Sequence, residues 1–173
     1  MAAGSDSSIE WAAEKGLSIL LGPHASHPET REKWDFYKAK LEGAGHSFQG
    51  REIPVTRTVA IGETMEEGFE LGRHGAEFMF GNYLKQSSNI RGGPKVAAEG
   101  KTQVSDAVLA AERENVDPIE RYVNQVALCG TPEKIIDDIE RLRETNKIEY
   151  LMIAPLGHES FIRFTEKVMP HFL

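Results

Sequence analysis

The sequence is poor in cysteine and has no long apolar run. Cys129 is the only cysteine among 173 residues, so no internal disulfide can form. This predicts a protein of a reducing compartment, which we take to be the cytoplasm. No apolar stretch approaches the roughly 20 residues that cross a bilayer, and the first residues lack the basic and apolar regions of an export signal. We therefore expect no membrane partner and no export.

Basic residues are also scarce. The chain has 20 Lys and Arg residues against 27 Asp and Glu residues, which gives a formal net charge of -7. Binding to nucleic acid generally requires clustered Lys and Arg side chains that displace counterions from the phosphates. The charge balance therefore argues against nucleic acid as a partner.

The remaining composition is that of an ordinary globular domain, with 40% hydrophobic and 27% charged residues. Helical and strand-like apolar patterns alternate along the chain, which is typical of an α/β domain with parallel strands. We expect one domain over residues 1–173. Its predicted strands are Leu17–Leu21, Ile53–Ile61 and Tyr150–Ala154, and its predicted helices are Ser5–Lys15, Pro28–Glu42, Thr64–Tyr83, one beginning at Thr131, and His158–Val168.

Local signals mark the ends and the buried faces of these elements. Tyr150–Ala154 is almost continuously apolar, which predicts a strand that is buried on both faces of a parallel sheet. The last helix is expected to turn Phe161 inward together with Phe164 and Val168. Residues that suit helix capping precede four of the helices: Ser5, Thr131, and the capping-box pairs Ser26–Glu29 and Thr64–Glu67.

Residues 85–116 interrupt the alternation of helices and strands. The segment contains Gly92-Gly93-Pro94 and has no sustained apolar period beyond a weak helical stretch near Val104–Ala111. A loop of this length in a compact domain is usually functional or disordered. We expect a mobile insert over residues 85–116, with an active-site cover as the alternative; its Lys and Arg residues suit either a solvated surface or an anionic ligand.

The segment Ala3–Ser8 leads directly into the first expected helix and contains Gly4, Ser5 and Ser8. Glycine lets a ligand approach the backbone, the first helical amides and the helix dipole favour an anion, and serine hydroxyls add donors. These features predict a phosphate site, while an ordinary helix cap is the alternative reading.

Two histidines and the cysteine are the other candidates for chemistry. His24 and His27 have the spacing of a possible metal pair, but no third ligand follows at a suitable interval. We expect them to belong to a polar loop and a helix entry, and we expect no metal site. Cys129 has no basic neighbour that would stabilise a thiolate, so we expect a small buried apolar side chain.

Taken together, several segments resemble bacterial luciferase and its flavin-dependent monooxygenase relatives. Members of that family are eight-stranded parallel barrels that use reduced FMN, or in some branches the deazaflavin F420, with oxygen and an organic substrate. The resemblance implies that Gly4, Ser5 and Ser8 help to hold the flavin phosphate. The segments that carry it, in order along the chain, are Ala3–Leu17, Gly130–Glu133, Tyr150–Ile153 and Val168–Pro170.

The resemblance places this chain in the C-terminal half of the barrel. A complete barrel needs about 250 residues, so we expect a partial (β/α)8 TIM barrel of luciferase-like type with parallel strands. In the family, the strand–helix units that this chain lacks contain much of the catalytic site, so no catalytic residue is assigned here. A half barrel exposes a strand edge, which predicts a homo-oligomer or a separate N-terminal half as partner. The expected function is that of a flavin-dependent monooxygenase, and the alternative is a non-catalytic flavin-binding or dimerisation module.

Overall fold

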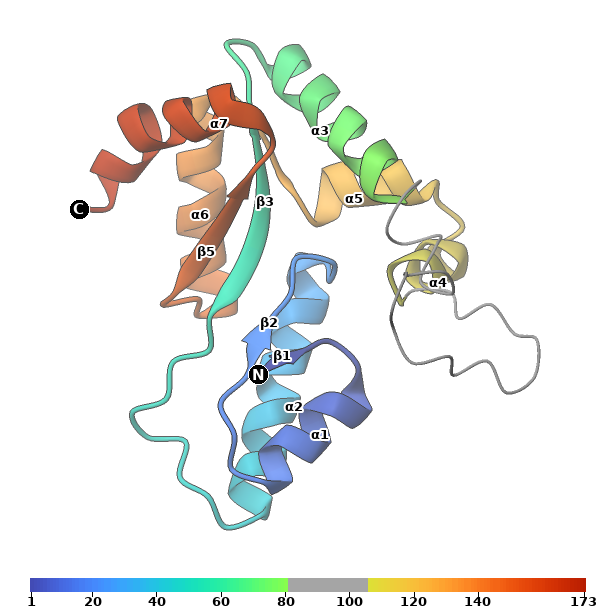
Figure 1. Cartoon of the computed structure of the whole chain (residues 1–173), viewed down its shortest axis with the longest axis vertical. Helices are drawn as coiled ribbons and strands as arrows, with labels where there is room; N and C mark the ends of the chain where they lie inside the picture. Colours follow the sequence, from blue (N-terminus) through green and yellow to red (C-terminus); the bar gives the residue numbers. More distant parts are fainter. Residues whose placement is uncertain (81–105) are drawn as a thin grey trace.

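The computed structural model describes residues 1–80 and 106–173, which form an α/β fold with parallel strands (Figure 1). Every recorded strand pairing is parallel. The α/β fold with parallel strands that was predicted from the sequence is therefore confirmed. The strands are β1 (Ala2–Ala3), β2 (Leu20–Leu21), β3 (Val55–Ile61), β4 (Leu128–Gly130) and β5 (Leu151–Pro155).

Strand β3 is the centre of the sheet. Val55 is paired with Leu21 of β2 and with Leu151 of β5, so these two strands lie on opposite edges of β3. Farther along β3, Ile61 is paired with Gly130 of β4. Strand β1 adds to the outer edge of β2. Within the part of the chain that the structure describes, β1, β4 and β5 each pair with a single strand and have a free outer edge.

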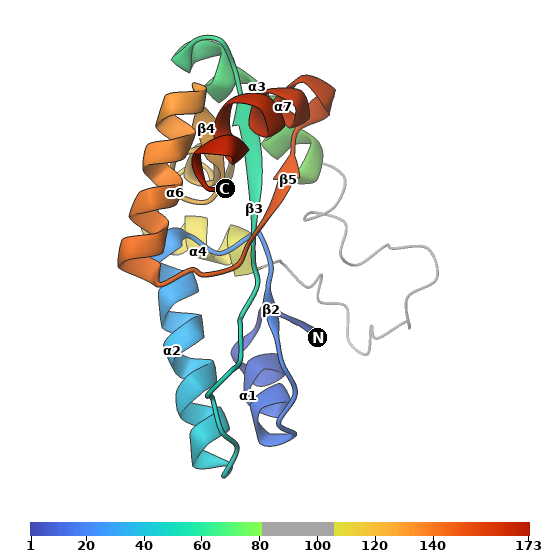
Figure 2. The same cartoon turned by 90° about the vertical axis from the view of Figure 1, so that its left-hand side faces the viewer.

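The helices cover the sheet in two groups. Helices α1 and α2 lie beside β1 and β2 at one end of the molecule, whereas α3, α6 and α7 surround the other half of β3 (Figures 1 and 2). The helices are α1 (Asp6–Glu14), α2 (His27–Gly43), α3 (Met65–Met79), α4 (Asp106–Glu114), α5 (Pro118–Gln125), α6 (Pro132–Asn146) and α7 (Gly157–Arg163), which continues as a π-helical turn (Phe164–Val168) and a 3-10 turn (Met169–His171).

Capping interactions fix the helix starts where the sequence predicts them. The side chains of Ser5 and Thr131 accept hydrogen bonds from backbone amides in the first turns of α1 and α6. Ser26 forms the expected reciprocal capping box at the start of α2. The capping box expected at Thr64 forms only in part. Thr64 caps α3, but the Glu67 carboxylate accepts from the amide of Glu63, 2.8 Å away, instead of the amide of Thr64. All four helix starts are nevertheless capped.

Two groups of buried side chains form the core. The larger lies between the sheet and helices α1, α2 and α6, and it includes Val55, Val59 and Ile61 of β3. The smaller joins α3, α5 and β4 around Tyr122, Ala76 and Cys129. Arg57, on the same strand as Val55 and Val59, is fully buried and donates to the hydroxyl of Thr30, 2.5 Å away.

Three predictions about the elements are wrong. Strand β5 is not buried on both faces, because Met152 is 38% exposed on a strand whose outer edge has no partner. Phe161 does not point inward, since it is 47% exposed whereas Phe164 and Val168 are buried. Strand β2 is limited to two residues of the predicted five. Helix α5 and strand β4 were not predicted, because eight and three residues are too short for an apolar period to be recognised.

The expected insert at residues 85–116 lies mostly outside the described residues. Its last part is described: α4 occupies Asp106–Glu114 and overlaps the weak helical stretch in the sequence. Among the residues that the structure covers, no helix combines the length and the apolar character needed to span a membrane.

Candidate functional site

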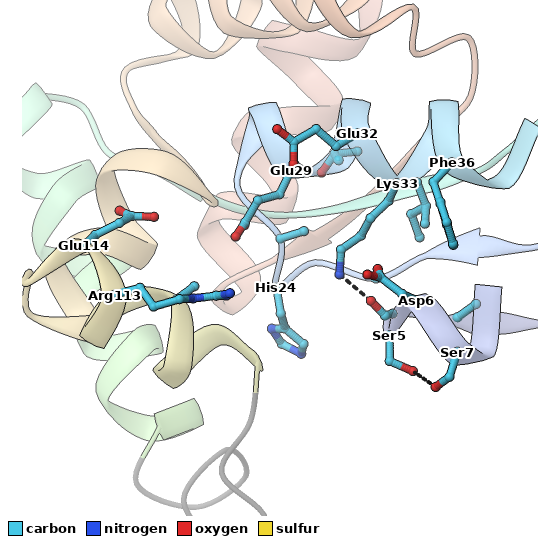
Figure 3. Close-up of a pocket in the computed structure, with 17 residues that line it drawn as sticks. Ser5, Asp6, Ser7, His24, Glu29, Glu32, Lys33, Phe36, Arg113 and Glu114 are labelled. Carbon is cyan, nitrogen blue, oxygen red and sulfur yellow. Dashed lines mark hydrogen bonds between the residues drawn. The ribbon is translucent and has the colours of Figure 1, made fainter. Parts of the chain in front are cut away.

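A cleft of about 990 Å³ lies between α1, α2 and α4, beside the carboxyl ends of β1 and β2 (Figure 3). Ligand sites of parallel α/β folds are found at this end of the strands. Two of the three predicted phosphate-site residues, Gly4 and Ser5, line the cleft. The lining also includes Ala3, Asp6, Ser7, Leu21, Gly22, His24, Ala25, Glu29, Thr30, Glu32, Lys33, Phe36, Ala110, Arg113 and Glu114.

The three predicted residues are joined by hydrogen bonds at the start of α1. The Ser5 hydroxyl accepts from the amide of Ser8, at 3.3 Å. The Ser8 hydroxyl donates to the Ser5 carbonyl oxygen, at 2.8 Å, and accepts from the amide of Gly4, at 3.3 Å. Ser8 is not among the residues that line the cleft. It therefore holds the turn formed by Gly4 and Ser5, while these two residues face the open space.

The start of α1 offers backbone donors to the cleft. The amides of Asp6 and Ser7 belong to the first turn, where no helical carbonyl is available to accept from them. The helix dipole adds partial positive charge at the same end. The hydroxyls of Ser5 and Ser7 lie 3.2 Å apart on this rim. A side chain at position 4 would meet no atom within 4 Å, so a ligand can approach the Gly4 backbone without obstruction.

Two basic side chains reach the cleft from other helices. The Lys33 ammonium extends from α2 and donates to the carbonyl oxygen of Gly4, and Arg113 enters from α4 (Figure 3). Neither was predicted as a site residue. Lys33 is 29 positions from Gly4 in the sequence, and only the packing of α1 against α2 brings the two together.

Two acidic side chains of the cleft lining pair with a further arginine. Glu29 and Glu114 bind the buried Arg121, with N–O distances of 3.1 and 2.8 Å. Burial would raise the pKa of Glu29, but the Ser26 amide and the Arg121 guanidinium together lower the pKa below its usual value. Both carboxylates are therefore ionised and paired at neutral pH. Arg121 consequently connects α2, α4 and α5 around the cleft.

His24 follows β2 and lines the same cleft. Its Nδ1 atom is buried and has no hydrogen-bond partner. Burial lowers the pKa of His24 below its usual value, so the ring is neutral at pH 7. His27 starts α2 and is not part of the cleft lining. In the described ranges, no three His, Cys, Asp or Glu side chains are grouped in a way that would hold a metal ion.

Solved structures with a similar fold cover nearly the whole chain. A monooxygenase from Streptomyces bottropensis is 17% identical, with a TM-score of 0.59 over 99% of this chain and 47% of its own. The oxygenating component of 3,6-diketocamphane monooxygenase from Pseudomonas putida, in complex with FMN, is 19% identical, with a TM-score of 0.61 over 96% of this chain and 46% of its own.

A third similar structure is the coenzyme F420-dependent tetrahydromethanopterin reductase from Methanopyrus kandleri. It is 15% identical, with a TM-score of 0.67 over 100% of this chain and 50% of its own. The chain thus spans about half the length of these proteins. At these identities the likeness shows the fold alone, and it confirms the predicted partial (β/α)8 barrel.

The sequence itself was also compared with known families. No curated protein matches it significantly. The profile of the family described as luciferase-like monooxygenase matches residues 1–146, which is most of the chain. The chain therefore belongs to the luciferase-like monooxygenase family.

Proposed function

We propose that this chain is the C-terminal half of a flavin-dependent monooxygenase barrel, in which the α1 end of the cleft holds the phosphate of the flavin. The observation that carries the proposal is the placement of Gly4, Ser5 and Lys33 together on the cleft wall at the amino end of α1. Gly4 and Ser5 would face the phosphate, and Ser8 would fix their turn.

The residues present fit an anionic group. The first-turn amides and the hydroxyls of Ser5 and Ser7 are hydrogen-bond donors, and the Lys33 ammonium supplies a positive charge within reach of Gly4. The Asp6 carboxylate on the same cleft wall opposes an anion, and the Lys33 ammonium and the first-turn amides have to outweigh it. A bound reduced flavin would supply the chemistry with oxygen, and this part of the chain would anchor and orient it.

The similar structures support a flavin-type cofactor. The Pseudomonas putida protein was solved with FMN, and the Methanopyrus kandleri enzyme depends on F420. We propose FMN as the ligand of this cleft, with F420 as the alternative, and a small organic molecule as substrate. The family match is to monooxygenases, which favours FMN.

Titration of the purified chain with FMN and riboflavin tests the phosphate site, because the two ligands differ only in the phosphate. We expect tighter binding of FMN. Ser5→Ala and Lys33→Ala should each weaken FMN about tenfold, the loss of a charge-assisted contact, and should leave riboflavin unchanged. Thr131→Ala is the matched control, since it removes the same kind of helix cap at α6, away from the cleft.

Equal affinity of the unaltered chain for FMN and riboflavin would contradict the phosphate site. So would a loss of FMN binding in Thr131→Ala as large as that in Ser5→Ala, because the effect would then come from reduced stability.

A non-catalytic flavin-binding module is the second candidate. It requires only the anion site at the start of α1, for which the described residues supply the donors. Oxygen-dependent oxidation of reduced FMN coupled to oxygenation of an organic acceptor separates the two. Turnover by the purified chain supports an enzyme, and flavin binding without product supports the module.

A further inference from the structure

His24 occupies the position after a barrel strand where side chains project into the ligand site. Strand β2 ends at Leu21, and Gly22 and Pro23 carry the chain to His24. Residues that follow the carboxyl ends of strands form the active site in barrel enzymes. The imidazole extends into the cleft between Arg113 and the serines of α1 (Figure 3).

The two ring nitrogens of His24 lie in different surroundings. Nδ1 is buried and has no partner, whereas Nε2 is not among the buried unpaired atoms and makes no recorded hydrogen bond with the described residues. A buried N–H without an acceptor is rarer than a buried acceptor without a donor. The neutral ring therefore carries its proton on Nε2, and Nε2 is the nitrogen that can meet a ligand.

No described neighbour of His24 accepts a recorded hydrogen bond from its Nε2 atom. The aromatic ring of Tyr122 lies beside His24, with its centroid 6.3 Å away and its plane tilted by 42°. The Tyr122 hydroxyl is already bonded to Thr58 Oγ1, at 2.7 Å, and to the Met79 sulfur, at 3.8 Å. This network holds the Tyr122 ring beside His24. The Nε2–H remains available on the cleft side.

We infer that His24 donates a hydrogen bond from Nε2 to an acceptor atom on the ring system of the ligand whose phosphate lies at α1. This inference rests on the proposed function and adds a second contact to it. Phosphate and ring would be held at separate points of one cleft, by α1 and by the loop after β2. Flavin rings carry carbonyl oxygens and unprotonated ring nitrogens that accept such a bond.

Two substitutions test the contact by titration with FMN and riboflavin. His24→Leu removes the donor and keeps a side chain of similar size, whereas His24→Gln retains an N–H donor at a comparable reach. Since riboflavin has the ring but not the phosphate, His24→Leu should weaken both ligands by the same factor, about fivefold for one hydrogen bond. His24→Gln should bind both nearly as well as the unaltered chain.

The outcomes separate this inference from the phosphate site. Unchanged binding in His24→Leu, or a loss confined to FMN, overturns the role of His24 while the FMN preference of the unaltered chain stands. Equal binding of FMN and riboflavin by the unaltered chain contradicts the phosphate site instead, and no binding of either overturns both.

The imidazole ¹⁵N spectrum of the unaltered chain provides a measurement that does not depend on a variant folding. Riboflavin should shift the Nε2–H resonance of His24, and no shift at saturating riboflavin overturns the inference.

Discussion

Cys129 illustrates how burial alone sets the chemistry of a residue. The side chain is 1% exposed, and Gly72 of α3 leaves the space that its sulfur occupies. Burial raises the pKa of the Cys129 thiol to about 12. A thiolate is the form that reacts with disulfide reagents. The expectation of a small buried apolar side chain at this position is confirmed.

We therefore predict that Cys129 of the folded chain does not react with an aromatic disulfide reagent at pH 8, and that it reacts within minutes in urea. Because the folded pKa lies above the ordinary value of 9.0, this thiol contributes stability below pH 9 that is lost as pH rises toward 12. Absorbance of the released thiol follows the reaction. Equal rates in the folded and the unfolded chain would show that the thiol is accessible.

His27 makes the fold sensitive to acid. Burial lowers its pKa from 6.5 to about 4, with smaller contributions from Arg57, Lys134 and Arg141. A neutral ring in the folded chain stabilises it above pH 6.5. That stability is lost as pH falls from 6.5 toward 4 and amounts to at most about 3 kcal/mol.

The test compares urea unfolding at pH 7 and pH 4.5 for the unaltered chain, His27→Gln and His171→Gln. His27→Gln should lose much less unfolding free energy between the two pH values than the unaltered chain. His171, which lies on the surface, is the control and should leave the loss unchanged. An equal loss in His27→Gln and the unaltered chain would mean that other groups cause the acid sensitivity.

At the scale of single residues, the features that could be predicted from the sequence are those that depend on residues close together in the chain. Ser5 and Thr131 cap their helices because the acceptor and the amide that it serves lie three residues apart. Lys33 and Arg113 were missed because they reach the cleft only through the packing of α1, α2 and α4. Nothing in the local sequence of either residue carries that information.

Helix α3 and strand β4 approach each other so closely that a glycine is needed between them. A side-chain carbon on Gly68 would lie 2.6 Å from backbone atoms of Gly130, which cannot move aside as a flexible side chain can. The contact fixes α3 against β4, and β4 in turn pairs with β3.

We predict that Gly68→Ala lowers the unfolding free energy by about 3 kcal/mol, the upper range for overpacking a core. Gly43→Ala is the matched control, since a side chain there meets no atom within 4 Å and alanine favours a helix. Urea denaturation followed by circular dichroism measures both. A Gly68→Ala chain as stable as Gly43→Ala would show that α3 and β4 can separate without cost.

At the scale of elements, long periodic segments were predicted well and short ones were not. Helices α2 and α6 have 17 and 15 residues, enough for an apolar stripe to be read. Strand β4 has three residues and is defined by its pairing with β3 rather than by its own pattern. The burial of β5 was overestimated because an apolar run does not reveal whether a neighbouring strand is present.

At the scale of the whole molecule, the described sheet has three strands with an unpaired edge: β1, β4 and β5. Tyr150 and Met152 are exposed at or beside β5. Unpaired edges and exposed apolar side chains favour association with another chain. The alternation of strands and helices predicted an α/β domain with parallel strands, and the partial barrel was implied by the family resemblance. Neither contained information on what pairs with the open edges.

We predict that the purified chain associates in a concentration-dependent manner, which sedimentation velocity measures, and that Met152→Lys shifts it toward the 19.2 kDa monomer. The charge would lie on the exposed face of the edge strand. Met65→Lys, on an exposed residue at the start of α3, is the control and should not change the distribution. A monomer at every concentration would favour a separate N-terminal half as the partner.

The account depends most on a flavin phosphate bound at the amino end of α1. The backbone amide resonances of Asp6 and Ser7, followed during titration with FMN and with riboflavin, test it most directly. We expect FMN to shift both resonances strongly and riboflavin to leave them nearly unchanged, because only FMN carries the phosphate. Equal shifts with both ligands, or no shift with FMN at saturation, would contradict the account.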